Sequence, residues 1–469
     1  MTTKDPDCRQ NITDSLAKYT ADLRFEEIDQ QSLSAAKSLF IDSVGCAIAS
    51  HHSATVAKCR ELVPSFPGPC TVLGTSMRTT MDMAAFVNGA AVRYLDMNDT
   101  YMGLGDPGHP SDMLSACLAV AQAQGSDGQA LITAIMIAYE VNCRLLDGSL
   151  LIPNGWDYTY MTLPATALAA GKLMKLDAER LAQAVNLSLV AHVPLLQTRA
   201  QHLSDWKGLA NAQATRDAVF AAQLAQHGVT GPAPIFEGTF GVFCQLGAEF
   251  NIDVDEFGGR SGQFRINATS VKRYSSEWFA LTAIHAAIDL APQVSDVSDV
   301  EEICVDTTAR GYKFLAAEAE KWHPQTRDAA DHSMPFIVAR ALLDRSITID
   351  SYSPAAIQDP RLQLLMAKVR VNEDKTLTAM FPAKTPNRLT IRLKDGRVLQ
   401  RQVDDLPGFA GRMMSRSEVE EKFRGNVSRL WSEEQTSRAL QSMWDLEQVK
   451  NLDTLLAQFV VHTRQPIGG

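Results

Sequence analysis

Residues 88–112 bring together side chains that can move protons. Acids, an amide and a hydroxyl come first, and a loop with three glycines then leads to a histidine. The polar members are Asp96, Asn98, Asp99, Thr100 and His109. Carboxylates and an imidazole on a flexible loop can supply a general acid and a general base. The alternative is ordinary capping, in which Ser111 or Asp112 caps the next helix and His109 packs against Pro110.

Two other segments carry cations suited to an anionic substrate. Lys207 stands at the start of a predicted helix, where the helix dipole disfavours a cation but attracts an anionic ligand. Lys272 and Arg273 are adjacent cations followed by the phenol of Tyr274, and this group can hold a carboxylate. The alternative for both segments is a solvated surface turn.

A third polar segment, residues 322–333, precedes an apolar helix pattern. Arg327 lies one and four residues before Asp328 and Asp331, so it can form local salt bridges with them. His332 and Ser333 can cap the helix that follows. A role in a binding site is the alternative interpretation.

The composition indicates a soluble globular protein. The chain has 469 residues, of which 45% are hydrophobic and 21% charged, and this length favours two domains. The net charge of -10 argues against nucleic acid or an anionic membrane as the main partner. A local basic pocket for a small anionic substrate remains compatible with it.

The eight cysteines do not form a metal-binding pattern. No two are spaced as Cys-x-x-Cys, and several lie in apolar helix patterns, so we interpret them as reduced and structural. They are Cys8, Cys46, Cys59, Cys70, Cys117, Cys143, Cys244 and Cys304. The first ten residues lack a signal core, and the longest apolar stretch, near 130–141, is too short to cross a membrane. A cytoplasmic enzyme without metal or other cofactor is the expectation.

Hydrophobic periodicity predicts a mainly α fold in two parts. The first 265 or so residues read as all-helical, with helices expected at 12–23, 32–49, 81–92, 113–123, 129–146, 165–172, 178–191 and 207–226. Strands are expected at 301–308 and 369–372, and helices are expected around them at 276–290, 328–343 and 360–368. Residues 388–393 and 397–403 flank Asp395-Gly396, which predicts a hairpin with a type I′ turn. The predicted domains are a helical one at 1–268, completed by 412–469, and an α+β one at 269–411.

Common nucleotide and hydrolase motifs are missing. Gly103, Gly105 and Gly108 have the wrong spacing for a dinucleotide fingerprint, and no predicted strand precedes them. The sequence contains no Walker loop, no Gly-x-Ser-x-Gly and no His-Glu-x-x-His.

A series of short motifs, taken together and in order, resembles the MmgE/PrpD family along nearly the whole chain. They are Asn88-Gly-Ala-Ala, Tyr94-Leu-Asp-Met-Asn-Asp-Thr-Tyr101, Gly108-His-Pro-Ser-Asp112, Ala169-Ala-Gly-Lys172, Trp206-Lys-Gly208, Thr230-Gly-Pro232, Phe236-Glu-Gly238, Lys272-Arg-Tyr274, residues 320–333 and Pro386-Asn-Arg388. Within the family, the Leu-Asp-x-Asn-Asp-Thr form and the residues 322–333 are most similar to the 2-methylcitrate dehydratases.

The resemblance implies a homodimer in which each chain has a helical domain, an α+β lid and a site between them. It implies a hydro-lyase of propionate catabolism (the methylcitrate cycle) that converts 2-methylcitrate into 2-methyl-cis-aconitate without an iron–sulfur cluster. Position by position, the family pocket falls on Asp96, Thr100, His109, Lys207 and Lys272.

The sequence departs from the family at one place. The helix after Tyr274 usually carries a histidine within a few residues, but Phe279-Ala-Leu-Thr282 stands there and the nearest imidazole is His285. The change bears on the substrate or on one proton transfer. Phe279 and Leu281 could line an apolar pocket for a longer alkylcitrate.

The expected mechanism is proton abstraction next to a carboxylate followed by loss of water. Asp96, Thr100, His109 and Lys207 are the expected catalytic residues, with His109 the best proton-transfer group by type. The expected substrate-binding residues are Asn98, Lys272, Arg273, Tyr274 and Arg327. Cations must absorb the charge that develops on a polycarboxylate substrate. The alternatives are a cis-aconitate decarboxylase, a polycarboxylate epimerase and a non-catalytic polycarboxylate-binding relative.

Overall fold

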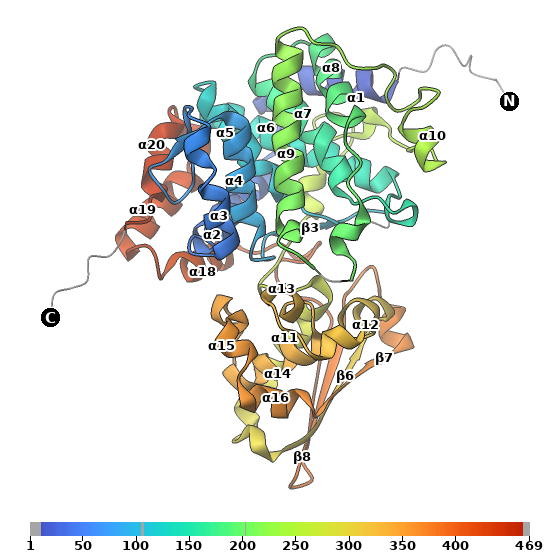
Figure 1. Ribbon diagram of the computed structural model, residues 1–469, viewed down its shortest axis with the longest axis vertical. Coiled ribbons are helices and arrows are strands. Elements are labelled where there is room, and N and C mark those ends of the chain that lie inside the picture. The colour runs from blue at the N-terminus through green and yellow to red at the C-terminus, as the bar shows by residue number, and fades with distance from the viewer. Residues whose placement is uncertain (1–10, 105–106, 202, 463–469) are drawn as a thin grey trace. The chain divides into compact units, whose positions relative to one another are not determined.

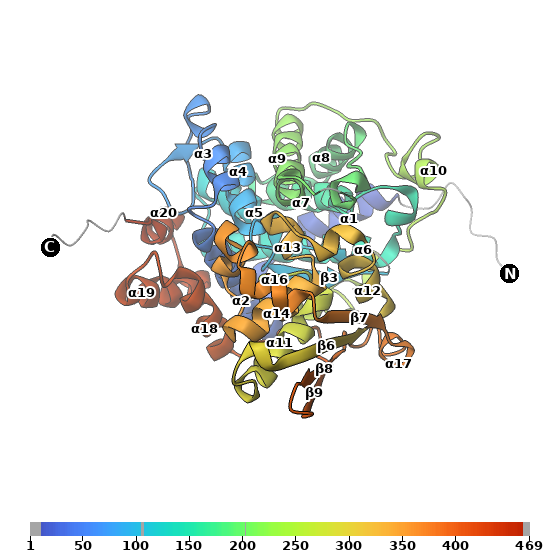
Figure 2. The same ribbon diagram turned by 60° about the horizontal axis from the view of Figure 1, so that its bottom comes forward.

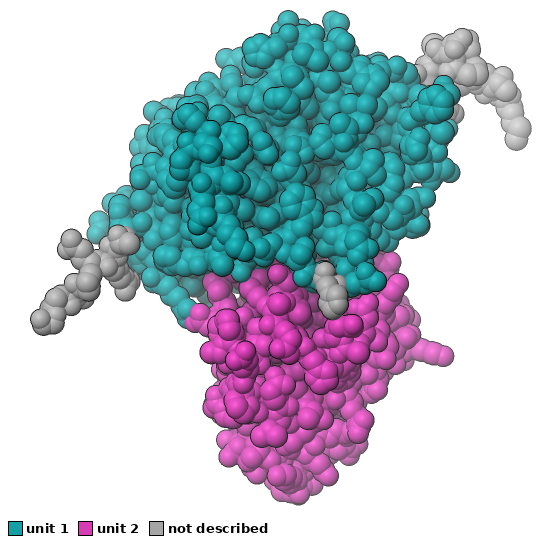
Figure 3. Space-filling model, viewed as in Figure 1, with its two compact units in different colours: residues 1–94, 98–270, 414–469 teal, residues 95–97, 271–413 magenta. Residues whose placement is uncertain are grey.

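The chain forms two compact units. The computed structural model describes residues 11–104, 107–201 and 203–462. Unit 1 comprises Met1–Tyr94, Asn98–Ser270 and Met414–Gly469, and unit 2 comprises Leu95–Met97 and Val271–Met413 (Figure 3). The sequence did not predict that Leu95–Met97, in the middle of the polar segment, joins unit 2. Cys8 and Gly105 lie outside the described residues.

Unit 1 is mainly helical (Figure 1). Its helices are α1 Ile12–Asp22, α2 Gln30–Ala49, α3 Ala54–Arg60, α4 Met81–Arg93, α5 Leu114–Ala123, α6 Gly128–Gly148, α7 Thr159–Leu173, α8 Ala178–Val190, α9 Trp206–Gln226, α10 Val242–Leu246, α18 Arg416–Val427, α19 Glu433–Trp444 and α20 Leu452–Leu456. Side-chain caps start several of them, as when Asp127 accepts from the backbone N–H of Ala130 at 3.0 Å. The predicted helices are confirmed, although α7 begins six residues before the helix expected at 165–172.

Small residues bring α4 and α9 close together. A Cβ added at Gly89 of α4 would lie 3.2 Å from the Cβ of Ala212 on α9. A Cβ added at Gly208, near the start of α9, would lie 4.0 Å from the Cα of Tyr94. The end of α4 therefore lies beside the start of α9, which brings the backbone after Arg93 near the turn that carries Lys207.

Two helices of unit 1 are long and apolar enough to span a membrane by length and composition alone. They are α2 and α6, and 78% and 89% of their apolar windows are buried inside the protein. The expectation that the apolar stretch near 130–141 is too short was wrong, because α6 extends it to 21 residues. Such burial is typical of a core helix in a soluble domain.

Unit 1 also contains short strands, so the prediction of an all-helical domain was wrong. Strand β1, Cys70–Thr71, pairs with β2, Arg78–Thr79. Strand β3, Asp99–Met102, pairs antiparallel with β4, Pro107–Gly108, within the segment expected to be a loop. Gly103 and Gly108 both pack directly against Leu146, where an added Cβ would collide. The glycines therefore let the chain fold back onto α6.

Unit 2 is built around a four-stranded sheet with the order β7-β6-β8-β9. Strand β6, Val300–Thr307, runs parallel to β7, Val369–Glu373, and antiparallel to β8, Asn387–Leu393, which pairs with β9, Val398–Val403. Helices α11, Leu281–Leu290, and α14, Met334–Asp344, cover one face (Figure 2). Shorter helices complete the unit: α12 Ala309–Leu315, α13 Arg327–Ala330, α15 Pro354–Ile357, α16 Pro360–Met366 and α17 Lys375–Thr378.

Two local predictions in unit 2 need correction. Only Gly396 has a positive φ in the hairpin turn, and its N–H donates to the carbonyl of Leu393. Lys394 and Asp395 therefore keep negative φ, so the turn is not type I′. The helix expected at 328–343 is also broken into α13 and α14, because Ser333 caps α14 by accepting from Phe336 N–H at 3.2 Å. The break leaves His332 in a turn.

Candidate active site

Two predicted residues, Thr100 and His109, lie together in unit 1. We call Arg93, Thr100, His109, Asp112 and Tyr158 the His109 cluster. A guanidinium nitrogen of Arg93, at the end of α4, lies 3.1 Å from Nε2 of His109. The Oγ1 of Thr100, on β3, lies 3.4 Å from Nδ1, and the Tyr158 ring meets the imidazole edge to face at 5.7 Å.

The contacts of His109 define its protonation. A guanidinium only donates hydrogen bonds, so Nε2 accepts from Arg93. The carbonyl oxygen of Asp99 only accepts, and it lies 2.5 Å from Nδ1, which therefore carries the hydrogen. The ring is thus the neutral Nδ1–H tautomer, with its lone pair on Nε2. A neutral imidazole is the form that can take up a proton.

A buried hydrogen-bond network lies behind this histidine. Asn98 donates to Ser111 Oγ and to Asp112 Oδ1, both at 2.9 Å. Asp99 accepts from Ser111 Oγ at 2.6 Å and from Tyr139 at 2.8 Å. Neither Ser111 nor Asp112 caps α5, so the capping interpretation was wrong. Asn98 is fully buried, and its predicted contact with substrate stays a prediction.

Burial makes two carboxyl groups of this network weak acids. Burial raises the pKa of Asp99 to about 6, against the hydrogen bonds from Ser111 and Tyr139 that favour the anion. Burial likewise raises the pKa of Asp112 to about 7, although Arg93, whose Nε lies 3.8 Å away, favours the anion. Asp112 thus changes charge close to neutral pH.

Arg199 links the His109 cluster to Lys207. Its Nε donates to Asp157 at 2.7 Å, and its guanidinium lies over the Tyr158 ring, 4.4 Å from the ring centre. It also donates to the backbone carbonyl of Lys207 at 3.5 Å. These contacts tie the first turn of α9 to the segment before α7. Lys207 itself is only 6% exposed, which is unusual for a lysine at a helix start.

A second group of predicted residues gathers in unit 2. We call Asp96, Lys272, Arg327, Asp331 and His332 the His332 cluster. Lys272 Nζ lies 2.6 Å from Asp96 Oδ1 and also donates to the carbonyls of Asp96 and Ser276. Arg327 donates to Leu95 O at 3.1 Å and lies 3.5 Å from Asp331 and 3.8 Å from Asp328. The predicted local salt bridges of Arg327 are confirmed.

His332 faces carboxylates on both of its nitrogens. Its Nδ1 lies 2.5 Å from Asp331 Oδ1, and its Nε2 lies 3.9 Å from Asp96 Oδ2. The side chain of Asp331 is fully buried, whereas that of His332 is 17% exposed. Two carboxylates around one imidazole favour its protonated form.

Asp96, Asp331 and His332 also have ligand atoms within 4.8 Å of one another, close enough to hold a metal ion. Their charges argue against that use. Lys272 already neutralises Asp96, and Arg327 neutralises Asp331. A divalent cation would add two positive charges beside two existing ones. The donor set therefore fits an ion-pair network better than a metal site.

The remaining predicted residues of unit 2 have partners of their own. The Tyr274 hydroxyl lies 2.9 Å from His285 Nδ1, and burial raises the pKa of Tyr274. Phe279 is 5% exposed and packs against Phe314 and Phe381 at ring distances of 6.1 and 5.7 Å. Arg273 is partly exposed at the start of this segment.

The structure thus divides the predicted site residues between the two units. Asn98, Thr100, His109 and Lys207 belong to unit 1, and Asp96, Lys272, Arg273, Tyr274 and Arg327 belong to unit 2. Sequence reasoning missed Arg93, Asp112, Tyr158 and Arg199, and it did not select His332. A signal for Arg93 was present, because it is a single cation at the end of a helix of small residues.

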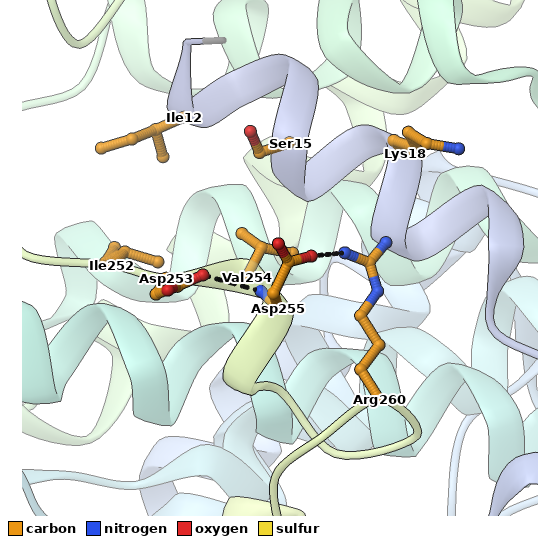
Figure 4. Close-up of a pocket in the computed structure, with 8 residues that line it drawn as sticks. All are labelled: Ile12, Ser15, Lys18, Ile252, Asp253, Val254, Asp255 and Arg260. Atoms are coloured by element: carbon orange, nitrogen blue, oxygen red, sulfur yellow. Dashed lines mark hydrogen bonds and ion pairs between the residues drawn. The ribbon is translucent and has the colours of Figure 1, made fainter. Parts of the chain in front are cut away.

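A pocket of about 230 Å³ lies elsewhere in unit 1, between α1 and residues 252–260. Figure 4 shows Ser15 and Lys18 on one side of it, and Asp255 paired with Arg260 at 3.0 Å on the other. No predicted site residue lines this pocket.

Comparison with known proteins identifies the family. A model described as the MmgE/PrpD N-terminal domain matches residues 14–255, and the MmgE/PrpD C-terminal domain matches residues 274–446. A 2-methylcitrate dehydratase of Cupriavidus necator is 28% identical, covering 94% of both chains. One of Escherichia coli strain K12 is 26% identical over 88% of this chain and 89% of its own. A mitochondrial one of Yarrowia lipolytica is 26% identical over 83% and 78%. This chain therefore belongs to the MmgE/PrpD family.

Proposed function

We propose that this protein is a hydro-lyase that removes water from 2-methylcitrate or a related alkylcitrate, without an iron–sulfur cluster. The product from 2-methylcitrate would be 2-methyl-cis-aconitate. The family and the printed names of relatives that match most of the chain support this reaction class.

The observation that carries the proposal is the neutral His109 with its lone pair on Nε2. A C–H next to a carboxylate is a weak acid, and its carbanion adds charge to a substrate that is already anionic. In the proposed step, Nε2 gives up the hydrogen bond from Arg93 and removes the proton, and nearby cations stabilise the developing charge. His109 has the cation Arg93 at 3.1 Å, and Lys207 is buried in the same unit.

We assign carboxylate binding to the cations of both units. Lys207 supplies a buried ammonium at the start of α9, where the helix dipole also attracts anions. Lys272 and Arg327 supply cations in unit 2, each already beside a carboxylate. Thr100, next to His109, is positioned to orient the substrate.

A decarboxylase or an epimerase acting on a polycarboxylate is the second candidate function. All three reactions change the bonding at a carbon next to a carboxylate, so the same base and cations could serve them. A decarboxylase must protonate carbon, whereas a dehydratase must protonate a departing oxygen.

A longer alkyl chain on the substrate receives no support from Phe279 and Leu281. Leu281 is fully buried in the core of unit 2. The ring of Phe279 packs against the rings of Phe314 and Phe381. These side chains stabilise the fold of unit 2. The homodimer, the cytoplasmic location, the lid and a site between the domains stay predictions.

The test is a direct assay. Purified protein is mixed separately with 2-methylcitrate, citrate and cis-aconitate, and ultraviolet absorbance and proton NMR follow the products. We expect an enoate from 2-methylcitrate, and no enoate from a His109→Ala variant that remains folded. No product from either citrate would contradict the proposal, and itaconate from cis-aconitate would identify a decarboxylase. A non-catalytic binding protein would bind the acids and convert none.

A further inference from the structure

The His332 cluster contains a histidine and an aspartate that the proposed reaction has not yet used. Asp331 is fully buried, and its carboxylate holds His332 Nδ1 at 2.5 Å. This contact orients the ring and leaves Nε2 directed toward Asp96 Oδ2, 3.9 Å away. A histidine oriented by a buried carboxylate is a common arrangement for proton transfer.

Four charged residues of the His332 cluster lie around the His332 ring. Asp331 and Asp96 are anionic, Lys272 pairs with the other oxygen of Asp96, and Arg327 lies 3.5 Å from Asp331. Tyr352 is a buried phenol whose pKa is raised by burial, so it stays neutral. These four charged groups sum to zero, Asp328 beside Arg327 at 3.8 Å adds one negative charge, and the protonated ring adds one positive charge. An anionic substrate would offset that charge and favour the imidazolium.

From this arrangement we propose that His332, oriented by Asp331, donates the proton to the hydroxyl group that leaves the substrate. The assignment rests on the proposed dehydratase function. The base removes the proton from carbon, and the electron pair of that C–H bond becomes the new double bond. The C–O bond breaks with its electrons on oxygen, and the Nε2 proton of His332 converts that oxygen to water. The neutral ring then regains a proton from solvent, to which it is 17% exposed.

The test compares two leaving groups in His332→Gln. One substrate is 2-methylcitrate, and the other is its analogue with fluorine in place of the leaving hydroxyl, because fluoride departs with little help from an acid. We expect kcat on 2-methylcitrate to fall by about 10² to 10⁴ and kcat on the fluoro analogue to fall by less than about tenfold. Equal losses on both substrates would overturn the assignment, as would a loss below about threefold on 2-methylcitrate.

His192→Gln is the matched control. His192 also faces an aspartate, with Nε2 3.1 Å from Asp217, but it lies in unit 1 outside both clusters. It should leave both activities unchanged. In Asp331→Asn, the basic limb of the kcat pH profile should move to lower pH by about one unit, because the carboxylate that favours the imidazolium is gone.

A second measurement does not depend on turnover. Histidines labelled with ¹⁵N report their protonation by NMR, and the signal missing from His332→Gln identifies this ring. With the unreactive propane-1,2,3-tricarboxylate added at pH 7, we expect the imidazolium, and a neutral ring would overturn the assignment. Failure of the wild type on both substrates would instead overturn the proposed function itself.

Discussion

His109 in unit 1 and His332 in unit 2 have opposite electrostatic surroundings. A guanidinium donates to Nε2 of His109, so that ring is neutral and its lone pair has a fixed direction. Carboxylates face both nitrogens of His332, which favours the proton on that ring. Enzymes that need an acid and a base at one pH commonly place two similar groups in such different environments. The contrast supports the proposed roles, in which His109 is the base and His332 is the acid.

The buried carboxyl groups of the two clusters also differ in their electrostatic surroundings. Asp112 is buried, with amide donors from Asn98 and Asn211 and with Arg93 Nε at 3.8 Å, and its pKa rises to about 7. Asp96 is also buried, but the Lys272 ammonium lies 2.6 Å away. A close cation keeps a buried carboxylate ionised, whereas amide donors alone do not. The His109 cluster therefore buries a carboxyl group that can become neutral, and the His332 cluster buries ion pairs.

The largest expected effect concerns the base. His109→Gln keeps a side chain of similar size but cannot take up the proton, so kcat should fall by about 10² to 10⁴. Steady-state kinetics with 2-methylcitrate measures the loss, and circular dichroism checks the fold. His192→Gln should retain full activity. A loss of less than about threefold in His109→Gln would remove this histidine from the mechanism.

The next effect tests whether the stability of unit 2 depends on the ion pair between Lys272 and Asp96. Lys272→Met leaves the Asp96 carboxylate buried without its closest cation, which typically costs about 3 to 5 kcal/mol in the free energy of unfolding. Lys18→Met is the control, because Lys18 pairs with Asp22 at 3.0 Å but is 61% exposed, and it should cost less than about 1 kcal/mol. Urea unfolding measures both. Equal small losses would mean that water reaches Asp96.

A smaller effect concerns Asp112 and pH. Its pKa is about 7 in the folded protein and near 3.8 when unfolded, so the folded state binds more protons between these values. The free energy of unfolding should therefore decrease as pH rises from about 4 to about 7. Asp112→Asn removes this titration, so its stability should depend less on pH. An unchanged slope in the variant would contradict the raised pKa.

The smallest effect concerns Arg93. Arg93→Gln can still donate to His109 Nε2 but removes the positive charge, so His109 should accept a proton more readily. The acidic limb of the pH profile of kcat/KM should then move to higher pH by about one unit. At a fixed pH on that limb, kcat/KM should be roughly tenfold lower than in the wild type. Arg93→Lys should restore the limb. Arg216→Gln, which removes a cation paired with Asp82 at 3.3 Å, should leave it in place.

The sequence predicted the elements of both units better than the contacts of the site. The predicted positions of α4, α9, β6 and β8 agree with the structure within a few residues. The strands β6 and β8 bury alternate residues, and the small and apolar residues of α4 are buried on all sides. Periodicity missed the β3 and β4 pair, which depends on Gly103 and Gly108 packing against the distant Leu146. Such long-range packing leaves no periodic pattern.

The candidate site shows the same limit. His109, Lys207 and Lys272 could be selected from the sequence as site residues by their side-chain types. The residues that they contact could not be selected in this way. Arg93 reaches His109 only because the helix ends beside the returning chain, and His332 meets Asp96 only because Leu95–Met97 joins unit 2. The proposed acid and base roles depend on these contacts, so the sequence alone could not suggest them.

The most direct test of the two roles is proton NMR of 2-methylcitrate in D₂O with three proteins. The wild type should form the enoate. His332→Gln should still exchange the acidic C–H for deuterium while forming little product, because its base is intact and its acid is missing. His109→Gln should do neither. If His332→Gln blocks exchange as fully as His109→Gln, or if His109→Gln exchanges at the wild-type rate, the assignment of base and acid to these two histidines is wrong.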